Sequence, residues 1–240
     1  MISTEKVREL TIKSQTLEQN LLREYYQNIF LSHFYQQAVA GSIYFKGGTA
    51  LRIIYGSPRF SEELDFSAHM VKIHDLENAI ISTLDSIQKE NISVSLQEAK
   101  TTSGGYLASI VFESAGFQKV IIQLEISFRK KDLEGEITTI SSDFTPPYTI
   151  NGLAQESLID EKVLALLSRK KPRDFYDLYY ILRSSLLPPD KKNILLDVLN
   201  ILKKTDLNFE KELKIFLPKS HWAIIRNFKS ILEHEIRRFS

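Results

Sequence analysis

Apolar residues recur at spacings of three and four along the first forty residues, which predicts helical structure over residues 3–40. The predicted elements that follow are shorter. An apolar run at residues 43–45 predicts a strand, and residues 49–55 predict a helix that stops at Gly56-Ser57-Pro58. A second strand is predicted over residues 64–68, and a helix over residues 75–89.

The spacing of apolar residues differs between the middle and the end of the chain. Three further strands are predicted at residues 93–98, 106–113 and 119–128. After Pro146-Pro147 the pattern is helical almost throughout, with predicted helices at residues 156–169, 173–184, 190–203, 208–215 and 220–237. We therefore expect an α+β fold: a mixed sheet flanked by helices over residues 1–148, with the N-terminal helices included, and a helical domain over residues 149–240.

Composition narrows the functional classes. The 240 residues carry a net charge of +1, so any contact with nucleic acid must come from local basic patches. Cysteine is absent, which excludes disulfides, thiolate metal sites and a cysteine nucleophile. No apolar run reaches the roughly 18 residues of a membrane span, and the N-terminus shows no secretion signal. We therefore expect a cytoplasmic protein without a membrane partner.

Candidate chemistry begins with a glycine pair and two acids. Gly47-Gly48, between a predicted strand and a predicted helix, would let backbone N–H groups approach phosphate oxygens, although a tight structural turn has the same pattern. Residues i and i+2 of a strand share a face, so Glu63 and Asp65 would present adjacent carboxylates. Two adjacent carboxylates repel each other unless a cation or a basic side chain lies between them, and Arg59 is one candidate for that side chain. Alternatively, both carboxylates face water.

Strand alternation adds a third acid. Over residues 119–128, one face carries Val120, Ile122, Leu124 and Ile126, and Glu125 lies on the other face. If that second face borders the strand of Glu63 and Asp65, Glu125 completes a carboxylate triad suited to magnesium; if it faces water, it has no such role.

The helical half contains its own candidates. Lys162 is flanked at i±3 and i±4 by apolar residues, so it either extends to solvent or reaches an anion inside the fold. Asp174 suits the first turn of a helix that follows Pro172, whereas Asp177 has apolar neighbours on both sides. A basic cluster beside them is either a solvated loop or a phosphate contact for RNA. It consists of Arg169, Lys170, Lys171 and Arg173.

Two motifs in this order resemble a known family. Lys46-Gly47-Gly48-Thr49-Ala50-Leu51, followed by Arg59-Phe60-Ser61-x-Glu63-Leu64-Asp65-Phe66, closely resembles the AbiEii/AbiGii-type nucleotidyltransferase toxins. Glu161-Lys162-x-x-Ala165-Leu166-x-x-Arg169 and Arg173-Asp174-x-x-Asp177-Leu178 resemble that family's second signature. The resemblance covers about 135 residues, and it implies a DNA polymerase β-like fold with a C-terminal helical domain.

The resemblance also implies an activity. Some toxins of this kind transfer nucleotides from an NTP to tRNA 3′ ends and so block translation, and a separately encoded antitoxin accompanies the toxin. By analogy, the catalytic residues are Glu63, Asp65, Lys162, Asp174 and Asp177, and Mg2+ is held by Glu63 and Asp65. Glu125 is expected as a third metal ligand from strand alternation and not from the family. The nucleotide-binding residues are Lys46, Gly47, Gly48, Thr49, Arg59 and Ser61. The family's first acid is more often Asp than Glu, so Glu63 is a departure.

Three other functions use the same residues. A metal-dependent nuclease would favour a lysine two residues after Glu125, where the chain has Ser127. A nucleotide-binding interaction module without turnover is compatible with the Glu63 departure. A protein-modifying transferase would use a side-chain hydroxyl as the acceptor in place of RNA.

Overall fold

The computed structural model describes residues 2–128 and 132–239 and divides into two compact units. Unit 1 consists of Met1–Gly56 and Phe60–Leu153, and unit 2 consists of Ser57–Arg59 and Ala154–Ser240. The tripeptide Ser57–Arg59 therefore leaves unit 1 and belongs to the helical unit. The expected boundary after residue 148 falls inside the last strand of unit 1.

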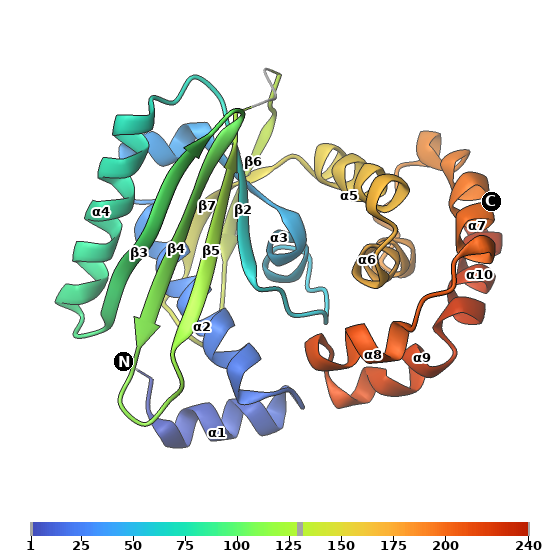
Figure 1. Cartoon of the computed structure of the whole chain (residues 1–240), viewed down its shortest axis with the longest axis horizontal. Helices are drawn as coiled ribbons and strands as arrows, with labels where there is room; N and C mark the ends of the chain where they lie inside the picture. Colours follow the sequence, from blue (N-terminus) through green and yellow to red (C-terminus); the bar gives the residue numbers. More distant parts are fainter. Residues whose placement is uncertain (1, 129–131, 240) are drawn as a thin grey trace. The chain divides into compact units, whose positions relative to one another are not determined.

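Unit 1 contains a seven-stranded mixed sheet and its helices (Figure 1). Its helices are α1 (Thr4–Lys13), α2 (Glu18–Phe34), the short 3-10 helix η1 (Ala38–Ser42), α3 (Gly47–Ile53) and α4 (Ile73–Lys89). Its strands are β1 (Ile43–Lys46), β2 (Glu63–Ala68), β3 (Ser93–Thr102), β4 (Gly105–Glu113), β5 (Val120–Ser127), β6 (Gly135–Ile140) and β7 (Tyr148–Leu153). The strand order is β3-β4-β5-β2-β1-β7-β6.

The centre of the sheet places the motif strands side by side. β1 pairs with β2 in the antiparallel direction, and β2 pairs with β5 in the parallel direction. Alternate residues of β5, from Val120 to Ile126, are buried. They join one apolar core with residues of α2, α3 and α4, among them Phe30, Ala50 and Ile80. The helices thus cover one face of the sheet, and the polar residues of β2 and β5 lie on the other face.

Unit 2 is helical. It contains α5 (Gln155–Arg169), α6 (Pro172–Arg183), η2 (Pro189–Lys191), α7 (Ile194–Lys204), α8 (Phe209–Leu213), η3 (Lys214–Phe216), η4 (Lys219–His221), α9 (Trp222–Arg226) and α10 (Phe228–Phe239). An aromatic cluster fills its centre, where Tyr176 stacks on Phe228 with ring centroids 5.7 Å apart. The predicted run of helices after residue 154 is confirmed.

The sequence pattern missed two strands. β7 begins directly after Pro146-Pro147, where the sequence pattern predicts the change to helices, and β6 lies in a stretch for which the pattern predicts no element. β7 pairs with β6 in the antiparallel direction and with β1 in the parallel direction, through Phe45 and Gly152. The pairing of β7 with β1 is long-range, so the local pattern does not display it.

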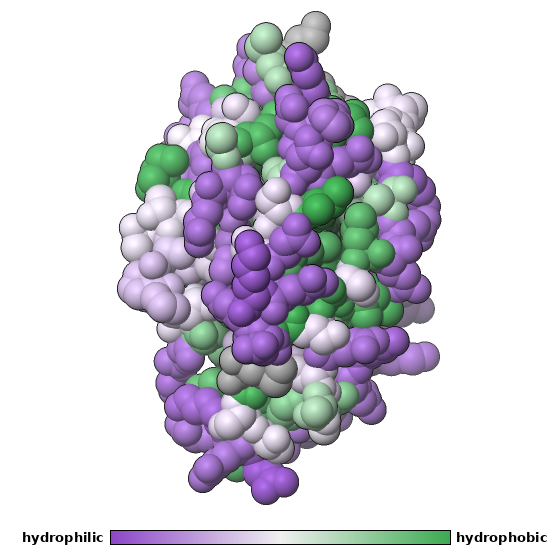
Figure 2. Space-filling model, turned by 90° about the vertical axis from the view of Figure 1, so that its left-hand side faces the viewer, coloured by the Kyte–Doolittle hydropathy of each residue, from purple (hydrophilic) through white to green (hydrophobic). Residues whose placement is uncertain are grey.

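The surface of unit 1 is mixed in character. Figure 2 looks onto the side on which α4 lies, where hydrophilic residues flank a band of apolar surface. On α4 itself, Ile81 is 50% exposed, and Leu96 of the neighbouring β3 is 37% exposed. Within the described part of the chain, no helix has both the length and the apolar character needed to cross a membrane.

Candidate functional site

The face of β2 and β5 opposite the helical core carries the predicted acids, and we call it the acidic face. Asp65 of β2 lies directly beside Glu125 of β5 in the parallel register, and Glu63 lies beside Gln123. On the other side of β2, Lys46 at the end of β1 is the antiparallel partner of Asp65. Glu125 therefore borders the first acidic strand, and its role as a metal ligand stays a prediction.

Gly47 brings the backbone close to the Asp65 carboxylate. Its φ of +80° lies in the left-handed region, which favours glycine. A Cβ on Gly47 would collide with the Asp65 side chain, with Oδ2 as the nearest atom. Glycine is therefore required here for two independent reasons, and the turn between β1 and α3 lies against the acid of β2.

The start of α3 is tied to β2. The Thr49 hydroxyl donates a hydrogen bond to the Glu63 backbone carbonyl, and the Thr49 side chain is fully buried. Thr49 and the glycine pair therefore fix the first turn of α3 against the beginning of the acidic strand. In this arrangement Thr49 supports the site through the backbone, in addition to the nucleotide-binding position that the family resemblance implies.

A cavity of about 340 Å³ opens on the acidic face. Lys46, Asp65 and Glu125 line one part of it. The rest is lined in large part by the turn between β3 and β4, Thr102–Gly105, and by Ser127. These hydroxyl and backbone groups are not among the residues that the sequence predicts for the site. The Gly104-Gly105 pair, which directly precedes the predicted strand at residues 106–113, is the signal in the sequence that could have indicated this turn.

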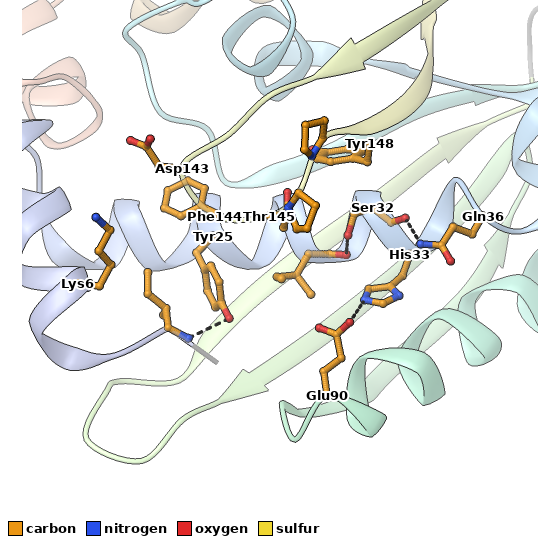
Figure 3. Close-up of a pocket in the computed structure, with 14 residues that line it drawn as sticks. Lys6, Tyr25, Ser32, His33, Gln36, Glu90, Asp143, Phe144, Thr145 and Tyr148 are labelled. Carbon is orange, nitrogen blue, oxygen red and sulfur yellow. Dashed lines mark hydrogen bonds and ion pairs between the residues drawn. The ribbon is translucent and has the colours of Figure 1, made fainter.

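A second cavity of unit 1, about 380 Å³, has a different character. Figure 3 shows it bordered by side chains of α2, including Tyr25 and His33, and by the segment that precedes β7. Its charged groups have partners within the protein. His33 Nε2 lies 3.1 Å from Glu90 Oε1, and Asp143 Oδ2 lies 2.8 Å from Lys13 Nζ. We place the candidate site at the cavity on the acidic face, because the neighbouring residues Asp65 and Glu125 both line it.

The acidic face fits a divalent cation only in part. Asp65 and Glu125 are neighbours on adjacent strands, and carboxylate oxygens are the ligands that Mg2+ prefers. Among the residues that the structure describes, no three His, Asp or Glu side chains gather closely enough to hold a metal ion by themselves. This arrangement suits Mg2+, which in phosphate chemistry is held by one or two carboxylates, with substrate oxygens and water supplying the remainder.

In unit 2, Asp177 of α6 holds two cations. Its carboxylate accepts hydrogen bonds from Arg59 Nε at 2.7 Å and Nη2 at 2.9 Å, and from Lys162 Nζ of α5 at 2.7 Å. The Asp177 side chain is only 2% exposed. Burial opposes ionisation, but the two cations outweigh it and lower the pKa of Asp177 to about 2. Lys162 therefore reaches an anion inside the fold.

The remaining predicted residues of unit 2 lie around the turn from α5 to α6. Asp174 is buried and caps α6, since its carboxylate accepts from the Lys171 backbone N–H at 3.2 Å and from Arg169 Nη2 at 2.7 Å. Lys170, in the left-handed conformation, ends α5. The side chains of Arg169, Lys170 and Lys171 are exposed, and Arg173 is half-buried.

Arg59 and Ser61 have contacts that the sequence did not indicate. Arg59, considered as a partner for Glu63 and Asp65, is buried in unit 2 and forms a bidentate pair with Asp177. Ser61 belongs to unit 1, where its backbone carbonyl accepts a hydrogen bond from Gln27 Nε2 of α2 at 3.1 Å. Their assignment to nucleotide binding stays a prediction.

Comparison with protein families gives one match. Residues 29–236 match the family described as nucleotidyl transferase AbiEii toxin, type IV toxin–antitoxin system. The match spans both units and contains every residue assigned above to the two signatures. No curated protein matches this sequence.

Solved structures with the same fold are distant in sequence. MenT4, a nucleotidyltransferase toxin from Mycobacterium tuberculosis, is 14% identical with a TM-score of 0.66, and the alignment covers 100% of this chain and 93% of that one. JHP933 from Helicobacter pylori is 21% identical with a TM-score of 0.62, covering 93% and 95%. At these identities the likeness shows the fold alone, and that fold is the one expected from the sequence.

Proposed function

Since the chain belongs to the AbiEii nucleotidyltransferase toxin family of type IV toxin–antitoxin systems, we propose that it transfers a nucleotide from an NTP to an RNA acceptor, the 3′ end of tRNA, and so blocks translation. The observation that carries the proposal is the juxtaposition of Asp65 with Glu125 across two parallel strands, with the Gly47 turn packed against Asp65. Acids and a close-approaching backbone together suit a cation-bound triphosphate.

The proposed reaction is a displacement at the α-phosphorus. An acceptor hydroxyl oxygen bonds to that phosphorus, the bond between the α- and β-phosphates breaks, and pyrophosphate leaves. Mg2+ held by Asp65 and Glu125, with Glu63 beside them, would supply charge neutralisation for the triphosphate. The chain's own groups bind and orient: Gly47 and Gly48 offer backbone N–H groups to phosphate oxygens, and a carboxylate of the acidic face accepts the hydroxyl proton.

The residues of the second signature have two proposed roles, which are to position other side chains and to contact phosphate. Asp177 stays ionised at neutral pH and accepts three hydrogen bonds from cations, so it is a poor proton acceptor. We assign it the role of holding Lys162 and Arg59. Lys162 is the candidate for stabilising phosphate charge, in keeping with the family's second signature, and Asp174 orders the start of α6 through its cap.

The charge distribution favours a polyanionic acceptor. Of the 31 Lys and Arg residues, 18 fall in unit 2, where they face only 12 of the 30 Asp and Glu residues. A net positive unit within a nearly neutral chain suits phosphate contacts. The exposed side chains of Arg169, Lys170 and Lys171, with Arg173 beside them, are the residues that we propose to hold the RNA. We propose that the protein acts in the cytoplasm, where it would meet its RNA substrate and a cognate antitoxin encoded nearby.

The experiment is a transfer assay. Purified protein is incubated with total RNA, Mg2+ and each α-labelled NTP in turn, and the labelled product is treated with RNase or with protease. We expect one preferred NTP, an RNase-sensitive product that comigrates with tRNA, and loss of transfer when EDTA is added.

Asp65→Asn is the matched control, because it keeps the side-chain shape and removes the charge. A protease-sensitive product would establish protein modification instead, shortened RNA a nuclease, and tight NTP binding without product an interaction module. Absence of any labelled product from folded wild-type protein, with toxicity in cells equal for wild type and Asp65→Asn, would contradict the proposal.

A further inference from the structure

The segment Phe60–Glu62, which leads into β2, is held by side chains of α2. Gln27 Nε2 donates to the Ser61 backbone carbonyl at 3.1 Å, and Arg23 Nη2 lies 3.1 Å from Glu62 Oε1. We call residues 60–62 the approach segment. Asp65 follows it by three residues, so the path of this segment sets where the acidic strand begins.

A third contact from α2 reaches the approach segment through α3. Arg52, in the last turn of α3, donates from Nε to Glu24 Oε1 at 2.8 Å and from Nη2 to Glu24 Oε2 at 2.9 Å. The guanidinium of Arg52 also lies over the Phe60 ring, 3.5 Å from its centroid. Glu24 therefore fixes a planar group that packs on the first residue of the approach segment.

The ion pair between Arg52 and Glu24 is expected to contribute little to the free energy of unfolding. Both side chains are largely buried, at 16% exposure for Arg52 and 14% for Glu24. The cost of desolvating such a pair offsets most of its attraction, so an apolar pair of similar volume would hold the helices equally well. The two parallel hydrogen bonds fix the rotation of the Arg52 guanidinium plane, which apolar packing would leave free.

Arg52 also belongs to the helix that begins at the glycine turn. α3 starts at Gly47, which packs against Asp65, and Thr49 binds the Glu63 carbonyl. Glu24 of α2 thus contacts the helix that begins at the Gly47 turn and, through Arg52, the segment that leads into β2. We propose that Glu24 is a positioning residue for nucleotidyl transfer, acting through Arg52 and Phe60 to set the Gly47 turn and the Asp65 carboxylate relative to each other. This inference rests on the proposed function.

The test uses Glu24→Gln, which keeps the side-chain shape and removes the charge, and Arg52→Lys, which keeps the charge and removes the bidentate fork. We expect kcat for NTP transfer to fall by about tenfold or more in both, with KM for the NTP changed by less than about threefold, as for a misplaced catalytic group. Hydrogen exchange should quicken at the backbone amides of residues 60–66 and stay unchanged in β3 and β4.

The control is Asp143→Asn, which breaks an exposed ion pair of unit 1 with Lys13 and should leave kcat, KM and exchange at wild-type values. Wild-type kcat and wild-type exchange over residues 60–66 in both folded variants would overturn the inference, as would faster exchange spread over the whole of unit 1. If the wild type transfers no nucleotide, the proposed function fails, and the exchange measurement decides the positioning role by itself.

Discussion

Arg59 and Asp177, 118 residues apart in the sequence, form a buried bidentate ion pair. The pair ties the tripeptide Ser57–Arg59 to α6 of the helical unit. Lys162 completes the group by donating to Asp177 Oδ2. One carboxylate thus serves as the counterion of two largely buried cationic side chains, so removing its charge is costly.

Replacing Asp177 with Asn should destabilise unit 2 severely. Loss of the carboxylate leaves Arg59 and Lys162 buried without their counterion, a change that costs about 3–5 kcal/mol of unfolding free energy. Urea unfolding followed by circular dichroism measures it. Asp197→Asn, at an exposed position on α7, is the control and should shift the midpoint little. A midpoint for Asp177→Asn within error of the control would contradict this role.

The same carboxylate predicts a pH dependence. Its pKa falls from 3.8 to about 2 on folding, so the unfolded chain binds the proton more readily than the folded chain. Its contribution to stability is fully present above about pH 4 and is lost as the pH falls through about 2. The unfolding free energies of wild type and Asp177→Asn should therefore converge between pH 4 and pH 2. A constant difference over that window would show that Asp177 does not carry the effect.

Gly47→Ala should abolish transfer and lower stability. Alanine is strained at a φ of +80°, and its Cβ would displace the Asp65 carboxylate. Gly41→Ala is a matched control, because a Cβ at Gly41 meets no atom within 4 Å. Transfer rates and melting temperatures are measured for both variants. An active Gly47→Ala protein with unchanged melting would mean that the turn has no part in placing Asp65.

The two acids of β2 should respond differently to substitution. We expect Asp65→Asn to lower kcat by about a hundredfold or more, because it removes a charge that, in the proposed reaction, holds Mg2+ at the triphosphate. Glu63→Asp restores the residue more common in the family and should retain transfer within about tenfold of wild type, with a changed Mg2+ dependence. Initial rates over a Mg2+ titration measure both effects. Equal losses in the two variants would assign both acids the same role.

Local patterns in the sequence were enough for most elements. Alternation of apolar residues in β5 placed Glu125 on the polar face, and the helical period after residue 154 predicted the second unit, because side-chain periodicity follows from strand and helix geometry. The pair Gly47-Gly48 predicted the turn into α3. The resemblance carried by the two motifs gave the fold and the family.

The tertiary structure decided which residues meet. Asp65 and Glu125 become neighbours only through the parallel pairing of β2 with β5, and β7 is held by pairing with β1, neither of which has a local signal. The sequence offers Glu63 and Asp65 as partners of Arg59, whereas the fold pairs Arg59 with Asp177. Sequence therefore determined the elements and the candidate chemistry of this protein. Long-range pairing determined the site, because a charge buried by folding must take the partner that the packed chain brings within reach.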